Sequence, residues 1–272
     1  MVDSVKELIL NIQDPTPSEK KLAKKLIGLD INEVVYMSIT ELSEKISSSE
    51  ATILRFCRKI GFKGFQDFKL ALSRDIALNQ KNEDMSATSS FLASISKSLE
   101  KSSDSLDEED INTVCKKMLN SRRLCAFGVG SSYVAPLFLK QRLLTVGKLV
   151  LAEQSSHTMT AIASNLNNKD VVLCFSVSGA TKDILDVAKI AKRSGAYIVS
   201  ITSYPSSPLG KLSDMIFNGC SKETSAYRGS LTHCMGQLFI AGILAESCVS
   251  MLGKEGEKIA FKTISDFSDK LI

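Results

Sequence analysis

The stretch DVVLCFSVSGATKDILDVAKIAKRSGAYIVSIT, residues 170–202, decides the fold class. Its two ends, 170–177 and 197–202, are short runs of apolar residues, which indicate buried strands. The segment between them, 181–195, has the pattern of an amphipathic helix and ends in glycine. A strand, a helix and a second strand in this order predict two parallel strands joined by a crossover helix.

The same alternation continues on both sides of this stretch. The expected strands are 124–129, 148–153, 170–177, 197–202 and 215–219, with helices between them. Because these strands are apolar nearly throughout, they predict a parallel sheet covered by helices on both faces, an αβα sandwich. Ligands of such sheets bind beyond the carboxyl ends of the strands.

The N-terminal part of the chain has a different, all-α pattern. Helices are expected to begin at Ser18, at Ser38, at about Glu50 and after Gly64, and Gly61 is expected to end the third of them. A Ser-, Lys- and acid-rich stretch follows, which predicts a linker that contains a helix or, alternatively, a disordered tether. The expected organisation is therefore α/β overall, with a helix-turn-helix bundle at 1–78, a linker at 79–106 and the sandwich at 107–272.

Composition excludes several classes of protein. The chain is 44% hydrophobic and 24% charged, with no run of eighteen apolar residues and no basic-then-apolar leader. We therefore expect a cytoplasmic protein without a membrane partner. Seven cysteines without a CxxC pair and only two histidines indicate reduced, buried thiols, and neither a metal site nor a cofactor is expected.

Basic residues are concentrated in one part of the helical region. Residues 51–74 contain six basic side chains and one acidic side chain, although the net charge of the chain is only +4. The helices at 38–46 and 49–60, joined by a turn of serines, have the helix-turn-helix layout. A solvated helix face is the alternative reading of the charge. The expected DNA-binding residues are Ser49, Glu50, Thr52, Arg55, Arg58, Lys59 and Lys63.

Two strand ends carry hydroxyl groups next to glycines. Ser131 and Ser132 follow the strand at 124–129, and Ser176, Ser178 and Thr181 come after the apolar run VVLCF at 171–175. Free N–H groups at helix starts bind phosphate, and hydroxyls add neutral donors. One such loop is weak evidence, since serine often caps helices. Two loops at corresponding strand ends of one sheet favour a phosphate site.

Nucleotide and catalytic signatures are missing from the sequence. There is no GxxxxGK[ST] run, and Gly128-Val129-Gly130 is not followed by the third glycine of a dinucleotide fingerprint. Glu153, His157 and Glu223 are the candidates for acid–base chemistry, but each has a structural alternative such as capping a helix or binding a sugar hydroxyl. We assign no catalytic residue.

Residues 16–77 resemble the N-terminal domain of the RpiR/MurR family of transcription regulators. The segments TPSEKKLAKKLI, MSITELSEKI and, above all, the RFCRK–GF–GF–FK run from Arg55 to Lys69 carry this resemblance. Residues 107–250 resemble the sugar isomerase (SIS) domain of the same regulators, through FGVGSS, DVVLCFSVSGATKDIL and ITSYPSSPLGKLSD. The two matches occur in the family's order.

The resemblance implies a regulator that is not an enzyme. Its affinity for operator DNA would be controlled by a phosphorylated sugar bound to the SIS domain, and it would act as a homodimer or tetramer. The serines and threonine of the two loops would hold the phosphate, and Glu223 and Arg228 would line the sugar pocket. The expected effector-binding residues are Ser131, Ser132, Ser176, Ser178, Thr181, His157, Glu223 and Arg228.

Two alternatives and three departures from the family pattern stay open. The chain is alternatively a sugar-phosphate isomerase or lyase with an accessory helical domain, or its helical domain serves oligomerisation only; the basic residues at 55–63 favour the regulator. Ser47-Ser48 replaces a common Gly-Val pair in the helix–helix turn, Ala180 replaces a glutamate, and HCMGQL at 233–238 replaces SRIAQL. We expect a looser turn or a different bound conformation, and an effector that differs from those of better-known members.

Overall fold

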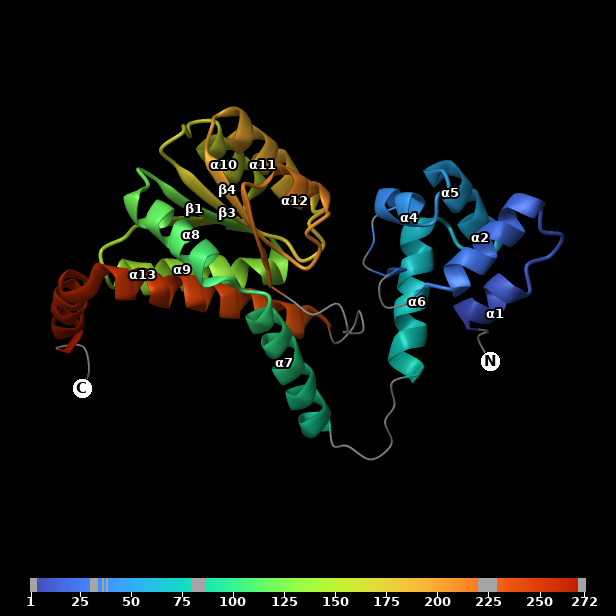
Figure 1. The fold of residues 1–272 in the computed structure, drawn as a ribbon, viewed down its shortest axis with the longest axis horizontal. Helices are drawn as coiled ribbons and strands as arrows, with labels where there is room; N and C mark the ends of the chain where they lie inside the picture. The colour runs from blue at the N-terminus through green and yellow to red at the C-terminus, as the bar shows by residue number, and fades with distance from the viewer. Residues whose placement is uncertain are drawn as a thin grey trace. The chain divides into compact units, whose positions relative to one another are not determined.

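The computed structural model describes residues 4–29, 34–35, 37, 39–79, 87–219 and 229–268. These residues form two compact units, one built mainly from the first 94 residues and the other from residue 95 onward (Figure 1). The expected domain boundaries at 78 and 106 stay a prediction. The helix within the expected linker is present as α7 (Ala87–Asp104).

The first unit is helical. Its described helices are α1 (Val5–Leu10), α2 (Pro17–Ile27), α4 (Ile39–Lys45), α5 (Glu50–Lys59) and α6 (Phe65–Asn79). The expected start of α2 at Ser18 is wrong by a small margin. Thr16 is the N-cap, because its Oγ1 accepts from the N–H of Glu19, while Glu19 accepts from the N–H of Thr16 and Pro17 fills the first helical position. Ser38 lies outside the described residues.

The helices α4 and α5 end in the same backbone motif. After α4, Ser47 has φ 50° and the N–H of Ser48 donates to the carbonyl of Ser43 at 2.9 Å. After α5, Gly61 has φ 101° and the N–H of Phe62 donates to the carbonyl of Cys57 at 2.9 Å. Both ends are Schellman motifs, which need a left-handed residue just past the helix. Gly61 therefore ends α5 as expected.

The second unit is the expected αβα sandwich. All five strands, β1 (Leu124–Gly128), β2 (Val150–Glu153), β3 (Val171–Phe175), β4 (Tyr197–Thr202) and β5 (Met215–Asn218), are parallel, in the order β2-β1-β3-β4-β5. One face is covered by α8 (Glu108–Asn120), α9 (Val134–Leu144) and α13 (Gly229–Ser268). The other face is covered by α10 (Ser156–Ala163), α11 (Lys182–Arg193) and α12 (Pro208–Leu212) (Figure 1).

Successive side chains of each strand point to opposite faces of the sheet, so each strand contributes to the apolar core on both faces. In β1, Leu124 and Ala126 pack toward α8, α9 and α13, whereas Cys125 and Phe127 pack toward α10 and α11. All four side chains are buried. A strand with two covered faces has no polar side, which explains why the central strands β1, β3 and β4, whose residues are almost all buried, are nearly continuous apolar runs.

The helix α13 is unusually long and apolar. Its segment Thr232–Thr263 is long and apolar enough to cross a membrane by length and composition alone, a test that core helices of soluble proteins also pass. Ile240, Leu244 and Cys248 are buried against the sheet, so packing accounts for the apolar face. The helix is interrupted at Gly253, where φ is 52° and ψ is −139°. The absence of a membrane partner stays a prediction.

The strand order defines where a ligand belongs. The connection after β1 leads to β2 on one side, whereas the connection after β3 leads to β4 on the other side, so the direction of the connections reverses between β1 and β3. Gly128 pairs with Phe175 at the carboxyl ends of these two strands. The loops that follow β1 and β3 therefore start side by side at the switch point of the sheet, where open α/β sheets bind ligands.

Candidate DNA interface and effector site

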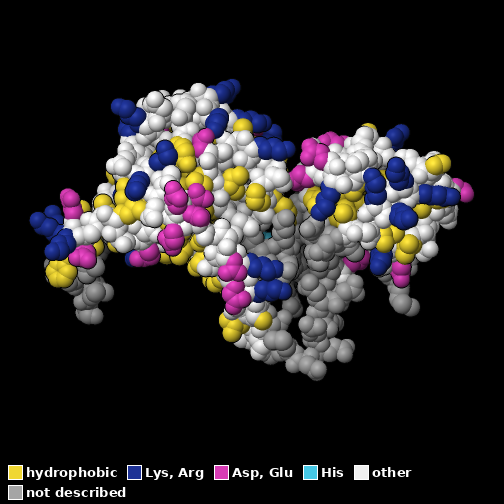
Figure 2. All heavy atoms as spheres, viewed as in Figure 1, with side chains coloured by type: hydrophobic (Ala, Val, Ile, Leu, Met, Phe, Trp, Pro, Cys, Tyr) yellow, Lys and Arg dark blue, Asp and Glu magenta, His cyan; other side chains and the backbone are white. Residues whose placement is uncertain are grey.

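The exposed face of α5 is the candidate DNA-reading surface. Ile53, Phe56 and Cys57 are fully buried, which directs Arg55 and Arg58 into solvent on the opposite side of the helix. Figure 2 shows Lys and Arg side chains gathered over α2 and α5. Ala51 shares this exposed face, and the sequence reading missed it because alanine carries no charge. A small apolar side chain suits contact with a thymine methyl group.

Lys59 has a structural partner in the helical unit. Its Nζ donates to Glu19 Oε2 at 2.8 Å and to the carbonyl of Asp14 at 2.9 Å. The hydrogen bond from Lys59, together with that from the N–H of Thr16, lowers the pKa of Glu19 to about 2. Lys59 therefore links α5 to the start of α2, and its expected role in DNA binding competes with this ion pair.

The remaining expected DNA-binding residues lie at the two ends of α5. Ser49 caps the helix by accepting from the N–H of Thr52 at 3.2 Å, and Glu50 accepts from Thr40 Oγ1 at 2.6 Å. Thr52 is half-buried on the first turn, and Lys63 is exposed beyond the last. The arrangement leaves Arg55, Arg58 and Lys63 as exposed cations whose side chains are not held in an ion pair that the described residues show.

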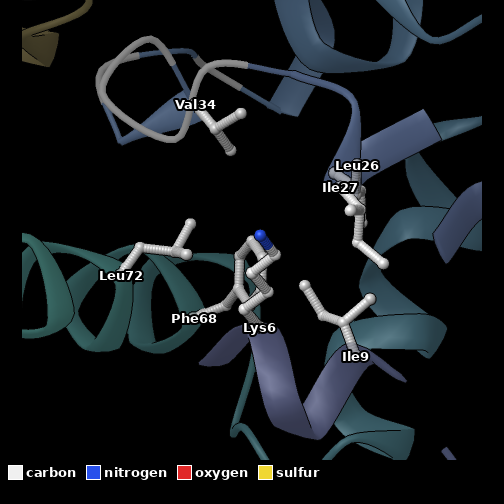
Figure 3. A pocket seen from close by; sticks show the side chains of 7 residues that line it. All are labelled: Lys6, Ile9, Leu26, Ile27, Val34, Phe68 and Leu72. Carbon is white, nitrogen blue, oxygen red and sulfur yellow. The ribbon is translucent and has the colours of Figure 1, made fainter. Parts of the chain in front are cut away.

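A small apolar cavity lies inside the helical unit (Figure 3). It is lined by Lys6, Ile9, Leu26, Ile27, Val34, Phe68 and Leu72, and its volume is about 20 Å³. This space holds about one water molecule. It is a packing defect of the core and is too small for a sugar phosphate.

The loop after β1 approaches its own strand closely. Gly130 has φ 61° and opens the 3₁₀ turn η1 (Gly130–Tyr133), in which Ser131 is exposed and Ser132 half-buried. A Cβ on Gly128 would lie 2.3 Å from the carbonyl oxygen of Ser132, so this tight turn requires glycine there. No side chain caps the start of η1, which leaves backbone donors of the turn open to an anion.

The loop after β3 is more strongly organised. Ser176 Oγ and Thr181 Oγ1 are 3.0 Å apart, and Ser178 Oγ accepts from the N–H of Ala180 at 3.2 Å. Gly179 has φ 58°, and a Cβ there would lie 2.0 Å from Ser207 Oγ. Thr181 is the N-cap of α11 but makes no side-chain capping bond, so N–H groups of that helix start lack the usual partner.

The structure brings the hydroxyls of both loops to one edge of the sheet through the pairing of β1 and β3. His157 is exposed on α10, which follows β2 on the other side of β1. Glu153 Oε1 accepts from the N–H groups of Gln154 and Ser155 at 2.8 and 2.9 Å, so it orders the turn that leads into α10. Glu223 and Arg228, expected to line the sugar pocket, lie outside the described residues.

Both parts of the chain match known protein families. Residues 5–79 match the helix-turn-helix domain of the rpiR family, and residues 117–246 match the SIS domain. An uncharacterised HTH-type transcriptional regulator of Clostridium perfringens is 31% identical over 262 residues, covering 92% of this chain and 93% of that protein. HTH-type transcriptional regulator HexR of Escherichia coli is 25% identical, covering 84% and 81% of the two chains.

Solved structures show the same fold. The NanR protein of Vibrio vulnificus, solved in complex with ManNAc-6P, gives a TM-score of 0.82 at 23% identity, covering 99% of this chain and 100% of that chain. The sugar isomerase domain of an RpiR transcription factor from Sphaerobacter thermophilus gives 0.56 at 16% identity, covering 66% of this chain and 99% of that chain.

A helix-turn-helix domain joined to a parallel αβα sandwich of the SIS type defines a class of DNA-binding transcription regulators. The length over which the Clostridium regulator aligns makes the assignment specific. This chain belongs to the RpiR family of HTH-type transcriptional regulators. The expected family and fold class are confirmed.

Proposed function

We propose that a phosphorylated sugar binds at the two serine-rich loops of the SIS domain and alters the affinity of the protein for its operator. The loop after β3 carries this proposal, because its hydroxyls and the uncapped start of α11 converge at the switch point of the sheet. NanR, which has the same fold, was solved with a sugar phosphate, and this supports the ligand class.

The residues that hold the phosphate in this proposal are those of the two loops. Ser132, Ser176, Ser178 and Thr181 donate to the phosphate oxygens, with Ser131 in the same loop. His157, Glu223 and Arg228 contact the sugar.

Replacing Ser178 with alanine tests the phosphate site. Ser178→Ala removes one hydroxyl donor to an anion, and we expect about a tenfold loss of sugar-phosphate affinity in a calorimetric titration. Ser164→Ala is the matched control, because Ser164 is an exposed serine at the end of α10, where its Oγ donates to the carbonyl of Thr160. Equal affinities in the two variants would dismiss the assignment.

The proposed DNA-reading surface is the exposed face of α5. Arg55 is the main contact, Thr52 and Ser49 lie at the amino end of the helix, and Arg58 and Lys63 contact phosphates. Arg55→Ala is expected to weaken operator binding by about tenfold or more, with the thermal midpoint unchanged, because the side chain is exposed.

Replacing Lys59 with methionine distinguishes a role in DNA binding from a role in the stability of the helical unit. Because Lys59 already pairs with Glu19, its loss is expected to lower thermal stability and to affect DNA affinity less than Arg55→Ala does. Fluorescence anisotropy with an operator fragment and thermal melts of the same samples measure both effects. A larger DNA defect in Lys59→Met than in Arg55→Ala would refute this division of roles.

Control by the effector requires that the sugar phosphate bind the DNA-competent and DNA-free states with different affinities. We further propose that the protein acts in the cytoplasm as a homodimer or tetramer, which matches operators with twofold symmetry. The proposal includes no catalytic turnover, since Glu153 is bonded to N–H groups of the turn before α10 and His157 is exposed on that helix. Conversion of a hexose or aminosugar phosphate by the purified protein would favour the isomerase alternative.

A further inference from the structure

Several buried polar side chains of the SIS domain find no hydrogen-bond partner. Among the described residues, Ser203 Oγ, Asn218 Oδ1, Thr232 Oγ1 and both amide atoms of Gln237 are in this position. Ser203, Thr232 and Gln237 are each 1% exposed. Burying a polar atom without a partner costs stability, and most native proteins avoid it. Ser200 has the same property but lies within β4.

One of these groups lies beside the loop that follows β3, and a second one ends the edge strand β5. The N–H of Ser203 donates to the carbonyl of Val177 at 3.0 Å, which joins the end of β4 to that loop. Asn218 is the last residue of β5 and pairs with Thr202, the last residue of β4. Both residues therefore lie at the carboxyl edge of the sheet, where the phosphate is proposed to bind. Asn218 follows Phe217, which packs toward α13, so the side chain of Asn218 points to the opposite face of the sheet.

The other two groups lie on the first turns of α13, which reach the same edge. Cys234 Sγ donates to the carbonyl of Ser131, in the loop after β1, at 3.6 Å. One turn later, Gln237 lies next to Gly219, since a Cβ on this glycine would be 3.6 Å from Gln237 Cα and Cγ. The first turns of α13 therefore extend from the loop after β1 to the end of β5.

The side chains of Ser203, Thr232 and Gln237 share one chemistry, because all of them are uncharged. The amide of Gln237 offers a donor and an acceptor, and the hydroxyls of Thr232 and Ser203 offer both from one atom. A buried carboxylate or ammonium group would need an opposite charge, which none of the three supplies. Sugar hydroxyls and acetamido groups donate and accept at once and are the complement of this set.

We propose that Ser203, Thr232 and Gln237 form a subsite that binds the uncharged, hydroxyl-bearing part of the phosphorylated sugar. The inference rests on the proposed function, in which the two loops hold the phosphate. The subsite gives the sugar its affinity beyond that of the phosphate alone. Buried polar groups left unpaired in the free protein gain their partners when the sugar binds, which makes the site selective against ligands that lack those hydroxyls.

Gln237→Met in the full-length protein tests the subsite, because methionine keeps the length of the side chain and removes both unpartnered atoms. Gln141→Met, at an exposed position of α9, is the matched control. Thr232→Val is the second variant and removes only a hydroxyl. Each protein is titrated with glucose 6-phosphate, N-acetylmannosamine 6-phosphate and inorganic phosphate, by calorimetry and by thermal shift.

We expect Gln237→Met to bind the better of the two sugar phosphates about tenfold more weakly. Its affinity for inorganic phosphate and its ligand-free thermal midpoint are expected to match or exceed those of the unaltered protein, since an unpaired buried amide has been removed. Thr232→Val is expected to show the same pattern with a smaller loss, and Gln141→Met no change.

Unchanged sugar-phosphate affinity in both Gln237→Met and Thr232→Val overturns the subsite and leaves the proposed function intact. A parallel loss of sugar-phosphate binding, phosphate binding and thermal stability in both variants also overturns it, because it shows a structural role. Failure of the unaltered protein to bind any of the three compounds overturns the proposed function and the subsite together.

Discussion

The residue that adopts a left-handed backbone conformation after α4 is a serine, and replacing it with glycine should stabilise the DNA-binding unit. Ser47 has φ 50°, and the same Schellman motif after α5 has glycine, Gly61, in the corresponding place with φ 101°. The chain thus contains one motif twice, once with the residue that suits it and once without. Ser47→Gly and Gly61→Ser are reciprocal substitutions within one protein.

The expected magnitude follows from two opposing effects. A side chain in the left-handed region costs about 1–2 kcal/mol, because Cβ crowds the following carbonyl oxygen. Glycine offsets roughly 0.5–1 kcal/mol of this gain, because it increases the conformational entropy of the unfolded chain. Ser47→Gly should therefore raise the free energy of unfolding of the helical unit by about 0.5–1 kcal/mol, and Gly61→Ser should lower it by a similar or larger amount. A Cβ on Gly61 meets no other atom within 4 Å, so conformational strain alone sets that loss.

Hydrogen exchange of the intact protein, read on peptides that cover α4 and α5, measures this change without interference from the SIS domain. A gain of about 0.5–1 kcal/mol slows exchange roughly two- to fivefold, since about 1.4 kcal/mol is a factor of ten. Ser48→Gly is the control, because Ser48 has no positive φ and should gain nothing. Faster exchange in Ser47→Gly, or equal exchange in Ser47→Gly and Ser48→Gly, would refute the reasoning.

Two further predictions concern the SIS domain. Gly179→Ala should destabilise it by roughly 2–4 kcal/mol in denaturant titrations, because the new methyl group meets a neighbouring side chain and the backbone is left-handed; a loss below about 1 kcal/mol would contradict the geometry. Burial alone would raise the pKa of Asp170, but hydrogen bonds from Arg122 and from backbone N–H groups hold that pKa below its ordinary value. Its contribution to stability is complete above the pKa of the unfolded carboxyl group, about 3.9, and is lost as pH falls through the lower folded pKa. In Asp170→Asn, stability should therefore fall less steeply as pH drops below about 4. Thermal melts at several pH values measure this, and the same decrease below pH 4 as in the unaltered protein would exclude this role.

Local patterns in the sequence predicted most of the architecture. The five expected strands lie within one or two residues of those in the structure. The signal is clearest for β1, β3 and β4, because a strand buried on both faces needs a continuous apolar run. The helix pair that carries Arg55 could also be predicted from the sequence, because an apolar stripe at helical spacing and a glycine at the helix end are local signals. The resemblance to the RpiR family was carried by short motifs and is confirmed by the full-length match.

Other features depend on contacts between distant residues and could not be read from the sequence. The start of α2 was missed for a different reason, because the capping box of Thr16 with Glu19 before Pro17 is a local signal that the expected start at Ser18 overlooked. Lys59 is expected to contact DNA by its helical position, and this stays a prediction; the structure adds that Glu19, forty residues earlier, accepts a hydrogen bond from its ammonium group. Charge along a single helix cannot reveal such a partner.

The sequence by itself determined that the chain has an all-α part followed by a parallel α/β part, because periodicity and apolar runs are properties of consecutive residues. Only the tertiary structure decided which loops share an edge. The pairing of Gly128 with Phe175 brings two serine-rich loops together, and α13 returns from the end of the sheet to set Gln237 beside Gly219. A ligand site of this kind is built from strand order and helix packing, which depend on the free energy of the whole core and leave no periodic signal in the residues that form the site.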